Sequence, residues 1–443
     1  MNLATSPVAP ADTRAAERLA LREPRTPEET GIDFGLILDL CLRTIYHAGR
    51  PSARQICRRL ALAFSVIEEV LIFLRKQELV EIVGSAARSE TEYEYALTSK
   101  GMAKTGEAIE RSEYVGPAPV PFDEYVRVTN LQAVREEAVS HTGVAAALSH
   151  LVLEPGTVKR IGTAVASGKS IFLYGDPGNG KSTIAESIGA MLPGRVYIPY
   201  AIEVYGQIIR IFDPRVHLLD QAPPLADEDA EFIDALRGDR DRRWVLSHRP
   251  VVIAGGELTL DELELRYSPT SKFYIAPLQM KANNGVLVLD DFGRQRVRAV
   301  ELLNRWMVPM ERRVDHLSLH TGDTIEVPFE LLLVFATNIT PSRLGDEAFF
   351  RRIRHKIRIQ DPTEAEFRAI IDQVARRSAV SLDETAVDEM IEDVYRTPGR
   401  PFRGVHPRDI VELIVDLSRY EGSAPAFSRE TVEQACASYF VQD

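Results

Sequence analysis

The chain has 443 residues, of which 45% are hydrophobic, and its formal net charge is -12. This composition fits a globular protein of two or three domains, and no run of about eighteen apolar residues is present that would span a membrane. The negative charge excludes attraction of the whole chain to nucleic acid, although a local basic patch would still bind it. The three cysteines, Cys41, Cys57 and Cys436, lie far apart, which argues against a disulfide framework and favours a reducing compartment such as the cytoplasm.

Residues 1–30 are rich in alanine, proline and charged side chains. They lack the apolar core of a secretory signal peptide. We therefore expect a disordered arm over this range.

Residues 31–112 carry the pattern of three helices, two strands and a further helix. The expected helices are Phe34–His47, Ser52–Leu60, Ser65–Lys76 and Lys100–Glu110, and the expected strands are Leu79–Val83 and Tyr93–Leu97. Three helices followed by a β-hairpin resemble a winged-helix domain, and the phrase QELVEIVG…YALTSKGMAKT is typical of such wings.

Two functions stay open for this winged-helix-like region. A winged helix usually places its third helix in the DNA major groove. Here the third helix carries Glu68 and Glu69, and acidic and basic residues balance over the region. This favours a protein-docking or oligomer-spacing module over DNA binding. Arg54, Arg58 and Arg59 keep nucleic-acid binding open as the alternative.

The rest of the chain divides into three stretches. Glycine and proline content predicts a Pro-rich linker over residues 113–130. Residues 131–361 alternate apolar strand patterns with helical patterns, which predicts an α/β core. Residues 362–443 are predicted to form a helical domain.

The sequence SIFLYGDPGNGKST contains a complete G-x-x-x-x-G-K-[ST] motif between a strand at Ile171–Tyr174 and a helix at Ile184–Met191. Glycines permit positive φ and bring backbone N–H groups close to phosphate oxygens, and the helix N-terminus adds a positive dipole end. Lys181 is expected at the β- and γ-phosphates, and Ser182 at Mg²⁺. The residues expected to bind ATP, called the P-loop below, are Gly175, Asp176, Pro177, Gly178, Asn179, Gly180, Lys181, Ser182 and Thr183.

Two further strands end in polar residues. The apolar run Val286–Leu289 is followed by Asp290 and Asp291. Ligands of open α/β sheets bind at the carboxyl ends of the strands, so Asp290 is expected in the Mg²⁺ shell and Asp291 is expected to polarise the attacking water. A strand at Leu331–Ala336 leads to Asn338, which alone would be a turn cap but in this order is expected to place that water.

The order of the P-loop, Asp-Asp, Thr-Asn and the sequence EAFFRRIRHKIRIQDP resembles the AAA+ ATPase superfamily from about Gly162 to the C-terminus. The resemblance implies an α/β P-loop NTPase core with a five-stranded parallel sheet, a C-terminal helical lid and a homo-oligomeric ring, with a hexamer as the expected form. It also implies that Arg351 or Arg352 reaches the γ-phosphate of a neighbouring subunit and stabilises charge in the transition state. A solvated basic edge is the alternative for these arginines.

The segment GVHPRDIVELIVDLSRY places Pro407 at a helix start, followed by Arg408. This is similar to the lid arginine that contacts the phosphates within one subunit, so Arg408 is expected to bind the nucleotide. A surface arginine in a first turn is the alternative, although its charge would oppose the helix dipole.

The phrases GQIIRIFDP, MKANNGVLVLDDFGRQR and LLNRWMVPMERRV resemble MoxR-like and magnesium-chelatase-like ATPases. One departure from the family pattern is Asp291, because a glutamate usually follows the first aspartate. The aspartate is one methylene shorter, which puts the rate of hydrolysis in doubt but not nucleotide binding.

The stretch before the Asp-Asp pair is longer than a minimal core needs. Asp213–Arg243 is mostly charged and is expected to be a flexible insertion. Residues 250–273 leave two interpretations open. Tyr267, Phe273 and Tyr274 either line a central pore or belong to ordinary core packing around an insertion hairpin.

Together these residues predict an ATPase that uses ATP and Mg²⁺ in a ring to remodel or assemble an unidentified client protein. Two alternatives use the winged-helix-like region on DNA: a DNA-linked motor or loader, and an ATP-controlled transcription regulator. Salt-sensitive DNA binding would favour the first, and sequence preference would favour the second.

Overall fold

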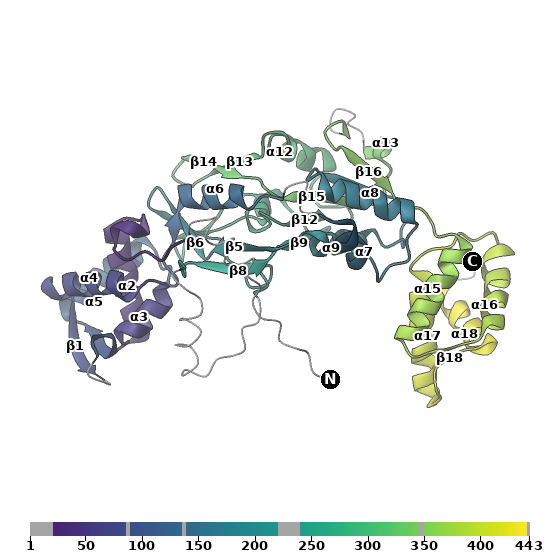
Figure 1. Ribbon diagram of the computed structural model, residues 1–443, viewed down its shortest axis with the longest axis horizontal. Coiled ribbons are helices and arrows are strands. Elements are labelled where there is room, and N and C mark those ends of the chain that lie inside the picture. The colour runs from purple at the N-terminus through teal and green to yellow at the C-terminus, as the bar shows by residue number, and fades with distance from the viewer. Residues whose placement is uncertain (1–20, 86–88, 135–138, 220–239, 345–349, 441–443) are drawn as a thin grey trace.

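The computed structural model describes residues 21–85, 89–134, 139–219, 240–344 and 350–440. Two five-stranded sheets lie in the middle of the molecule, with the N-terminal helices at one end (purple) and the C-terminal helices at the other (yellow-green; Figure 1). Within these ranges no helix combines the length and the apolar character needed to cross a membrane.

The first sheet is entirely parallel, with the strand order β16-β4-β15-β12-β9. Its strands are β4 (Ile171–Tyr174), β9 (Val251–Ala254), β12 (Val286–Leu289), β15 (Leu332–Thr337) and β16 (His355–Arg358). All residues of β12 and β15 are buried, as central strands covered on both faces require. The predicted α/β fold with a five-stranded parallel sheet is confirmed. The fifth strand, β9, was not expected in this sheet, because residues 250–273 were considered as an insertion hairpin. An antiparallel strand pair does form later in that stretch, between Arg266–Ser268 and Phe273–Ile275.

Helices cover both faces of this parallel sheet through two different apolar clusters. Because successive residues of a strand point to opposite faces, Phe172 and Leu173 enter different clusters. On one face Leu173 packs beneath three helices, α7 (His141–Ala147), α8 (Pro155–Ala166) and α9 (Lys181–Met191). On the other face Phe335 packs against Trp306 of α12 (Ala299–Arg312), with ring centroids 6.4 Å apart.

The second sheet is mixed, with the order β10-β11-β7-β6-β3. Its strands are β3 (Val120–Pro121), β6 (Ala201–Val204), β7 (Gln207–Arg210), β10 (Arg266–Ser268) and β11 (Phe273–Ile275). β3 and the helix that follows it, α6 (Phe122–Leu131), fall almost wholly in the range expected to be a linker. They are part of the folded core, because Tyr125 and Val128 are 2% and 0% exposed. Proline residues here mark a short edge strand rather than a free linker.

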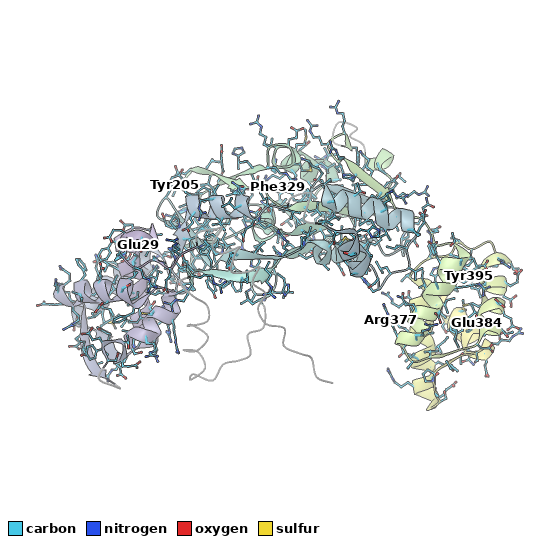
Figure 2. All side chains as sticks on the ribbon, viewed as in Figure 1. Glu29, Tyr205, Phe329, Arg377, Glu384 and Tyr395 are labelled. Carbon is cyan, nitrogen blue, oxygen red and sulfur yellow. The ribbon has the colours of Figure 1, made fainter. Side chains whose placement is uncertain are left out.

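The aromatic residues considered for a pore belong to this second sheet. Tyr274 is buried and its ring centroid lies 5.0 Å from that of Tyr267. Phe273 packs edge-to-face on Tyr114 at 5.6 Å. These contacts match the packing alternative and leave Tyr274 inaccessible to a pore. By contrast, Tyr205 in the turn between β6 and β7 is 68% exposed and lies at the surface (Figure 2).

Two antiparallel strand pairs and several short helices complete the middle of the chain. The pairs are β5 (Arg195–Pro199) with β8 (Trp244–His248), and β13 (Val314–Ser318) with β14 (Thr324–Pro328). The short helices are η4 (Leu260–Leu263), α11 (Leu278–Lys281) and α13 (Pro341–Leu344). Residues 220–239 of the expected flexible insertion lie outside the described residues, whereas Asp241 and Arg243 at its end are buried.

The N-terminal region follows the element order expected from the sequence. Its elements are η1 (Glu28–Thr30), α2 (Phe34–Ala48), α3 (Ala53–Leu60), α4 (Phe64–Lys76), β1 (Val80–Ser85), η2 (Glu90–Glu92), β2 (Tyr93–Leu97) and α5 (Ser99–Arg111). Asp33 and Ser52 cap α2 and α3 with side-chain hydrogen bonds. Residues 21–30, which the sequence placed in a disordered arm, pack against the fold: Leu21 is 3% exposed, and Thr30 is 1% exposed.

The C-terminal helical region has its own apolar core. Its elements are α15 (Glu364–Arg377), β17 (Ser381–Leu382), α16 (Glu384–Met390), the short π-helix η5 (Ile391–Arg396), α17 (His406–Glu421), β18 (Ala426–Phe427) and α18 (Arg429–Tyr439). Tyr395 lies inside this core (Figure 2) and stacks on Phe402 with centroids 5.1 Å apart. The helical prediction for this part of the chain agrees with these elements.

Candidate functional site

The P-loop connects the carboxyl end of β4 to the first turn of α9. Gly175 has φ of 148°, and a Cβ atom there would lie 2.2 Å from the Ile359 carbonyl oxygen. Gly180 has φ of 75° and caps α9. The glycines are therefore required by the backbone, because a side chain would strain or block the turn. Asp176, Pro177 and Thr183 are exposed around it.

Lys181 is held across the P-loop. Its Nζ donates a hydrogen bond to the Asp176 carbonyl oxygen at 2.8 Å, and the residue is only 7% exposed. Burial lowers the pKa of Lys181, and nearby carboxylates oppose that effect. A lysine in this setting places a single positive charge inside the loop, where phosphate oxygens would neutralise it.

The hydroxyl of Ser182 meets Asp290 across the parallel sheet. Ser182 Oγ, on the first turn of α9, donates to Asp290 Oδ1 at 2.9 Å, and Asp290 directly follows β12. Gln295 Nε2 donates to the Asp290 carbonyl oxygen at 2.9 Å and orders the loop behind it. One hydroxyl and one carboxylate suit Mg²⁺, which binds few protein oxygens and completes its shell with phosphates and water. The described residues contain no cluster of three or more His, Cys, Asp or Glu side chains that would cage a metal by themselves.

Asp291 and Asn338 lie together beside this pair. Asn338 Nδ2 donates to Asp291 Oδ1 at 3.4 Å, with Asp291 exposed and Asn338 half-buried. Asp291 has φ of 47°, a left-handed conformation that is uncommon for residues other than glycine. This backbone turn brings the Asp291 side chain toward Asn338 rather than continuing β12. The structure thus brings together Lys181, Ser182, Asp290, Asp291 and Asn338 at one edge of the sheet.

The two arginines expected to act across a subunit boundary differ in their surroundings. Both follow Phe350, whose ring packs edge-to-face on Phe172 at 5.1 Å. Arg352 forms an ion pair with Glu311 of α12 in the same chain. Arg351 is exposed. Arg351 is therefore the better placed of the two to contact a neighbouring molecule.

Arg408 does not contact the P-loop in this structure. It lies on the first turn of α17, its side chain is 61% exposed, and it pairs with Asp409 at 3.1 Å and Glu412 at 3.7 Å. A different arginine of the same segment reaches the P-loop: Arg403 Nη1 lies 3.0 Å from Asp176 Oδ2. The sequence analysis missed Arg403, because no motif marks it. The only feature of the sequence that could have indicated Arg403 is that it stands next to Gly404, just before the helix that begins at His406.

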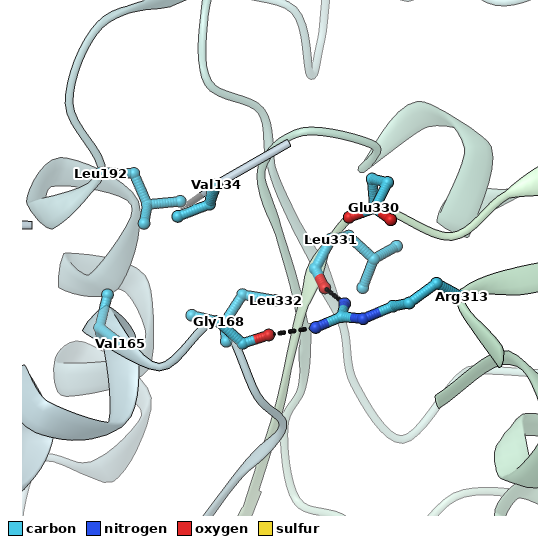
Figure 3. Close-up of a pocket in the computed structure, with 8 residues that line it drawn as sticks. All are labelled: Val134, Val165, Gly168, Leu192, Arg313, Glu330, Leu331 and Leu332. Atoms are coloured by element: carbon cyan, nitrogen blue, oxygen red, sulfur yellow. Dashed lines mark hydrogen bonds between the residues drawn. The ribbon is translucent and has the colours of Figure 1, made fainter. Parts of the chain in front are cut away.

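A small hollow, shown in Figure 3, lies elsewhere on the protein. Arg313 spans it, donating to the Leu331 carbonyl oxygen at 3.0 Å and to the Gly168 carbonyl oxygen. Gly168 precedes β4, and Leu331 precedes β15, so the hollow is at the amino ends of the strands. The P-loop and Asp290 are at the carboxyl ends. The hollow is therefore not part of the candidate site.

A family model described as "Domain of unknown function (DUF8689)" matches residues 363–438, which is the C-terminal helical region. No curated protein sequence matches the chain.

Among solved structures, the chain is similar to NtrX from Brucella abortus and to mutants of RuvB from Thermotoga maritima. For one NtrX structure the TM-score is 0.39 at 14% identity, covering 67% of this chain and 57% of NtrX. NtrX in complex with ADP has a TM-score of 0.40 at 14% identity, covering 78% of this chain and 68% of that one. One RuvB mutant has a TM-score of 0.34 at 16% identity, covering 68% of this chain and 71% of RuvB. In the first of these matches the chain thus spans less than two thirds of NtrX.

Proposed function

We propose that this protein is an AAA+-type ATPase that binds ATP with Mg²⁺ at the P-loop and hydrolyses it. The observation that carries this proposal is the 2.9 Å contact between Ser182 Oγ and Asp290 Oδ1, which joins the P-loop helix to the end of β12. A hydroxyl and a carboxylate in contact at the carboxyl edge of a parallel sheet form a ready Mg²⁺ site beside a phosphate-binding loop.

The roles of the site residues follow from their positions. Lys181 and the backbone N–H groups of the P-loop hold the phosphates, and Ser182 with Asp290 holds Mg²⁺. Asp291, steadied by Asn338 at 3.4 Å, orients and polarises the attacking water. Mg²⁺ supplies charge stabilisation at the phosphates when it is bound.

Nucleotide binding to the full chain is the first test. Lys181→Ala removes the only side-chain cation that the P-loop motif itself supplies, so we expect ATP binding and hydrolysis to be lost. Lys159→Ala is the matched control, because Lys159 is an exposed lysine on α8 that belongs to none of the motifs of the candidate site. Hydrolysis by Lys181→Ala at the rate of the unmodified protein would refute the assignment of the site.

We further propose that the subunits form a ring, with Arg351 of one subunit completing the site of the next. The exposure of Arg351 and the intramolecular pairing of Arg352 with Glu311 support this choice. An arginine supplied by a neighbour stabilises charge developing on the transferred phosphoryl group.

Mixing two inactive variants tests this arrangement. Arg351→Ala retains an intact P-loop, and Lys181→Ala retains Arg351, so a mixed ring contains complete sites. We expect each variant alone to be nearly inactive and the mixture to regain ATPase activity. A rate per subunit that is independent of protein concentration, with no recovery on mixing, would show that each chain acts as a monomeric switch.

We propose that the ring remodels or assembles a client protein in the cytoplasm and that the winged-helix-like N-terminal region docks this client. The MoxR-like phrases of the sequence support this subgroup. Arg54, one of three arginines that would approach DNA, is paired with Glu92 at 2.7 Å. This neutralisation weakens the case for phosphate contacts. ATPase stimulation by DNA at low salt would instead support a DNA-linked motor.

A further inference from the structure

The P-loop of this protein contains a carboxylate side chain, that of Asp176. The side chain of Asp176 is 51% exposed beside Lys181, whose Nζ contacts the Asp176 carbonyl oxygen at 2.8 Å. An unpaired carboxylate within a few ångströms of a polyphosphate repels it. A nucleotide site with Asp176 in its loop therefore needs a cation to offset that charge.

Arg403 supplies a cation at this position. Its Nη1 lies 3.0 Å from Asp176 Oδ2, and it also pairs with Asp361, which follows β16 at the junction with the C-terminal helical region. The Arg403 side chain is only 19% exposed. An arginine this shielded interacts more strongly than a surface arginine, because solvent screens it less.

Backbone contacts fix the Arg403 segment on the P-loop. The Val405 N–H donates to the Gly178 carbonyl oxygen at 2.7 Å, and the Gly404 N–H donates to Asn179 Oδ1 at 3.1 Å. A Cβ atom at Gly178 would lie 2.7 Å from Val405 Cγ1, so only glycine permits this approach. The backbone of residues 403–405 therefore lies directly on the P-loop, in addition to the contact made by the Arg403 side chain.

Asp361 completes the arrangement from the core side. Asn179 Nδ2 donates to Asp361 Oδ1 at 2.6 Å, and the same carboxylate oxygen accepts from Arg403. One carboxylate thereby connects the P-loop to the C-terminal helical region. Removing Arg403 would leave Asp176 and Asp361 without this shared cation.

We propose that Arg403 is a positioning residue that sets nucleotide affinity by neutralising Asp176 and by holding the C-terminal helical region against the P-loop. This inference rests on the proposed ATP site and adds to it a residue that acts through Asp176 and Asp361. It differs from the role expected for Arg408, which would contact phosphate directly and pairs here with carboxylates of its own helix.

The decisive measurement is the dissociation constant of a fluorescent ADP analogue with Mg²⁺ for the full chain. We expect Arg403→Ala to weaken binding about tenfold or more, the scale of one lost charge-assisted hydrogen bond. Arg403→Lys should recover part of the affinity, because it keeps the charge but not the planar fork. Arg396→Ala is the control: Arg396 pairs only within the C-terminal helical region in the contacts described, with Glu364 at 2.7 Å and Glu392 at 3.1 Å.

A double-mutant cycle with Asp176→Asn separates charge neutralisation from a merely structural role. If Arg403 acts by offsetting Asp176, its loss should weaken binding much less in the Asp176→Asn background. Equal losses in both backgrounds, or an Arg403→Ala affinity within about twofold of the unmodified protein, would overturn the inference. Failure of the unmodified protein to bind any nucleotide would instead overturn the proposed function on which the inference rests.

Discussion

The two five-stranded sheets of this protein are built in different ways. The parallel sheet has strands of four to six residues, and its central strands β12 and β15 are buried along their whole length. The mixed sheet combines a two-residue strand, β3, with strands of three and four residues from two later parts of the chain, residues 201–210 and 266–275. The candidate site lies wholly at the carboxyl edge of the parallel sheet.

The two sheets therefore have different roles: the parallel sheet carries the candidate site, and the mixed sheet supports the fold. Carboxyl ends of parallel strands converge on one edge, so polar residues that follow different strands meet there. In the mixed sheet the antiparallel and parallel pairs alternate, and strand ends point in both directions. That sheet instead packs a continuous apolar cluster and joins the N-terminal region to the core. We therefore expect substitutions at the two sheets to have different effects.

The largest effect on activity is expected from Asp291→Asn at the parallel sheet. Loss of the carboxylate should slow ATP hydrolysis by about 100-fold or more, the scale of general-base catalysis. Nucleotide affinity and stability should stay near those of the unmodified protein, because asparagine tolerates the φ of 47° at this position. Single-turnover hydrolysis and nucleotide titration measure the two quantities separately.

Asp323→Asn provides the control for this variant, since Asp323 lies in the exposed turn between β13 and β14. A rate within about threefold of the unmodified protein for Asp291→Asn would contradict the role of Asp291. In that case the short side chain of Asp291 could not be what limits the rate of hydrolysis.

The largest effect on stability is expected from Arg243→Ala beside the mixed sheet. Arg243 and Asp241 form an ion pair in which both side chains are 2% exposed. Arg243 also donates to the carbonyl oxygens of Thr30 and Pro119 at 2.8 and 3.1 Å. Its removal leaves a buried carboxylate unpaired, which typically costs about 3–5 kcal/mol of unfolding free energy.

The two tryptophans allow this cost to be assigned to a region. Trp244 lies in the cluster of the mixed sheet, and Trp306 lies in a cluster of the parallel sheet. Tryptophan fluorescence during denaturant unfolding follows the mixed sheet in the Trp306→Phe background and the parallel sheet in the Trp244→Phe background. We expect Arg243→Ala to shift the Trp244 transition more. Arg266→Ala is the control from the same sheet, because the exposed side chain of Arg266 on β10 should change stability by only about 0.5 kcal/mol or less. Equal shifts of both transitions would show that the sheets unfold as one unit.

The same contrast explains which parts of the structure could be predicted from the sequence. β4, β12 and β15 were located because apolar runs precede polar residues of known chemical type, and Gly175 to Ser182 form a complete motif. β3 was missed, because a two-residue strand has no periodicity and its register depends on β6, which lies far along the chain. β9 was missed because it was attributed to an insertion, although Val251 to Ala254 is an apolar run like the others.

The candidate site shows a similar limit. Ser182, Asp290, Asp291 and Asn338 were assigned together because each follows or begins a recognisable element. Arg403 lies in a loop outside the helices and acts through Asp176, which is distant in the sequence. Contacts of that kind depend on how the C-terminal helical region docks, and no local pattern encodes the docking.

The smallest expected effect concerns His217, which connects the two sheets. Its Nδ1 accepts from the Asp213 N–H at 2.9 Å, and its Nε2 lies 2.9 Å from the Lys281 carbonyl oxygen. Asp213 follows β7 of the mixed sheet, and Lys281 belongs to α11, which precedes β12. This pattern requires a neutral imidazole protonated at Nε2, because a second proton on Nδ1 would face another donor.

Burial lowers the pKa of His217 below its usual value of about 6.5, although Asp213 opposes the shift. A histidine with a lowered pKa in the folded state contributes stability above its unfolded pKa, and this contribution is lost as the pH falls below about 6.5. Unfolding free energy should therefore decline between about pH 7 and about pH 5, and His217→Gln, which cannot be protonated, should decline less. If both proteins follow the same pH profile, the link through His217 does not contribute to the coupling of the two sheets.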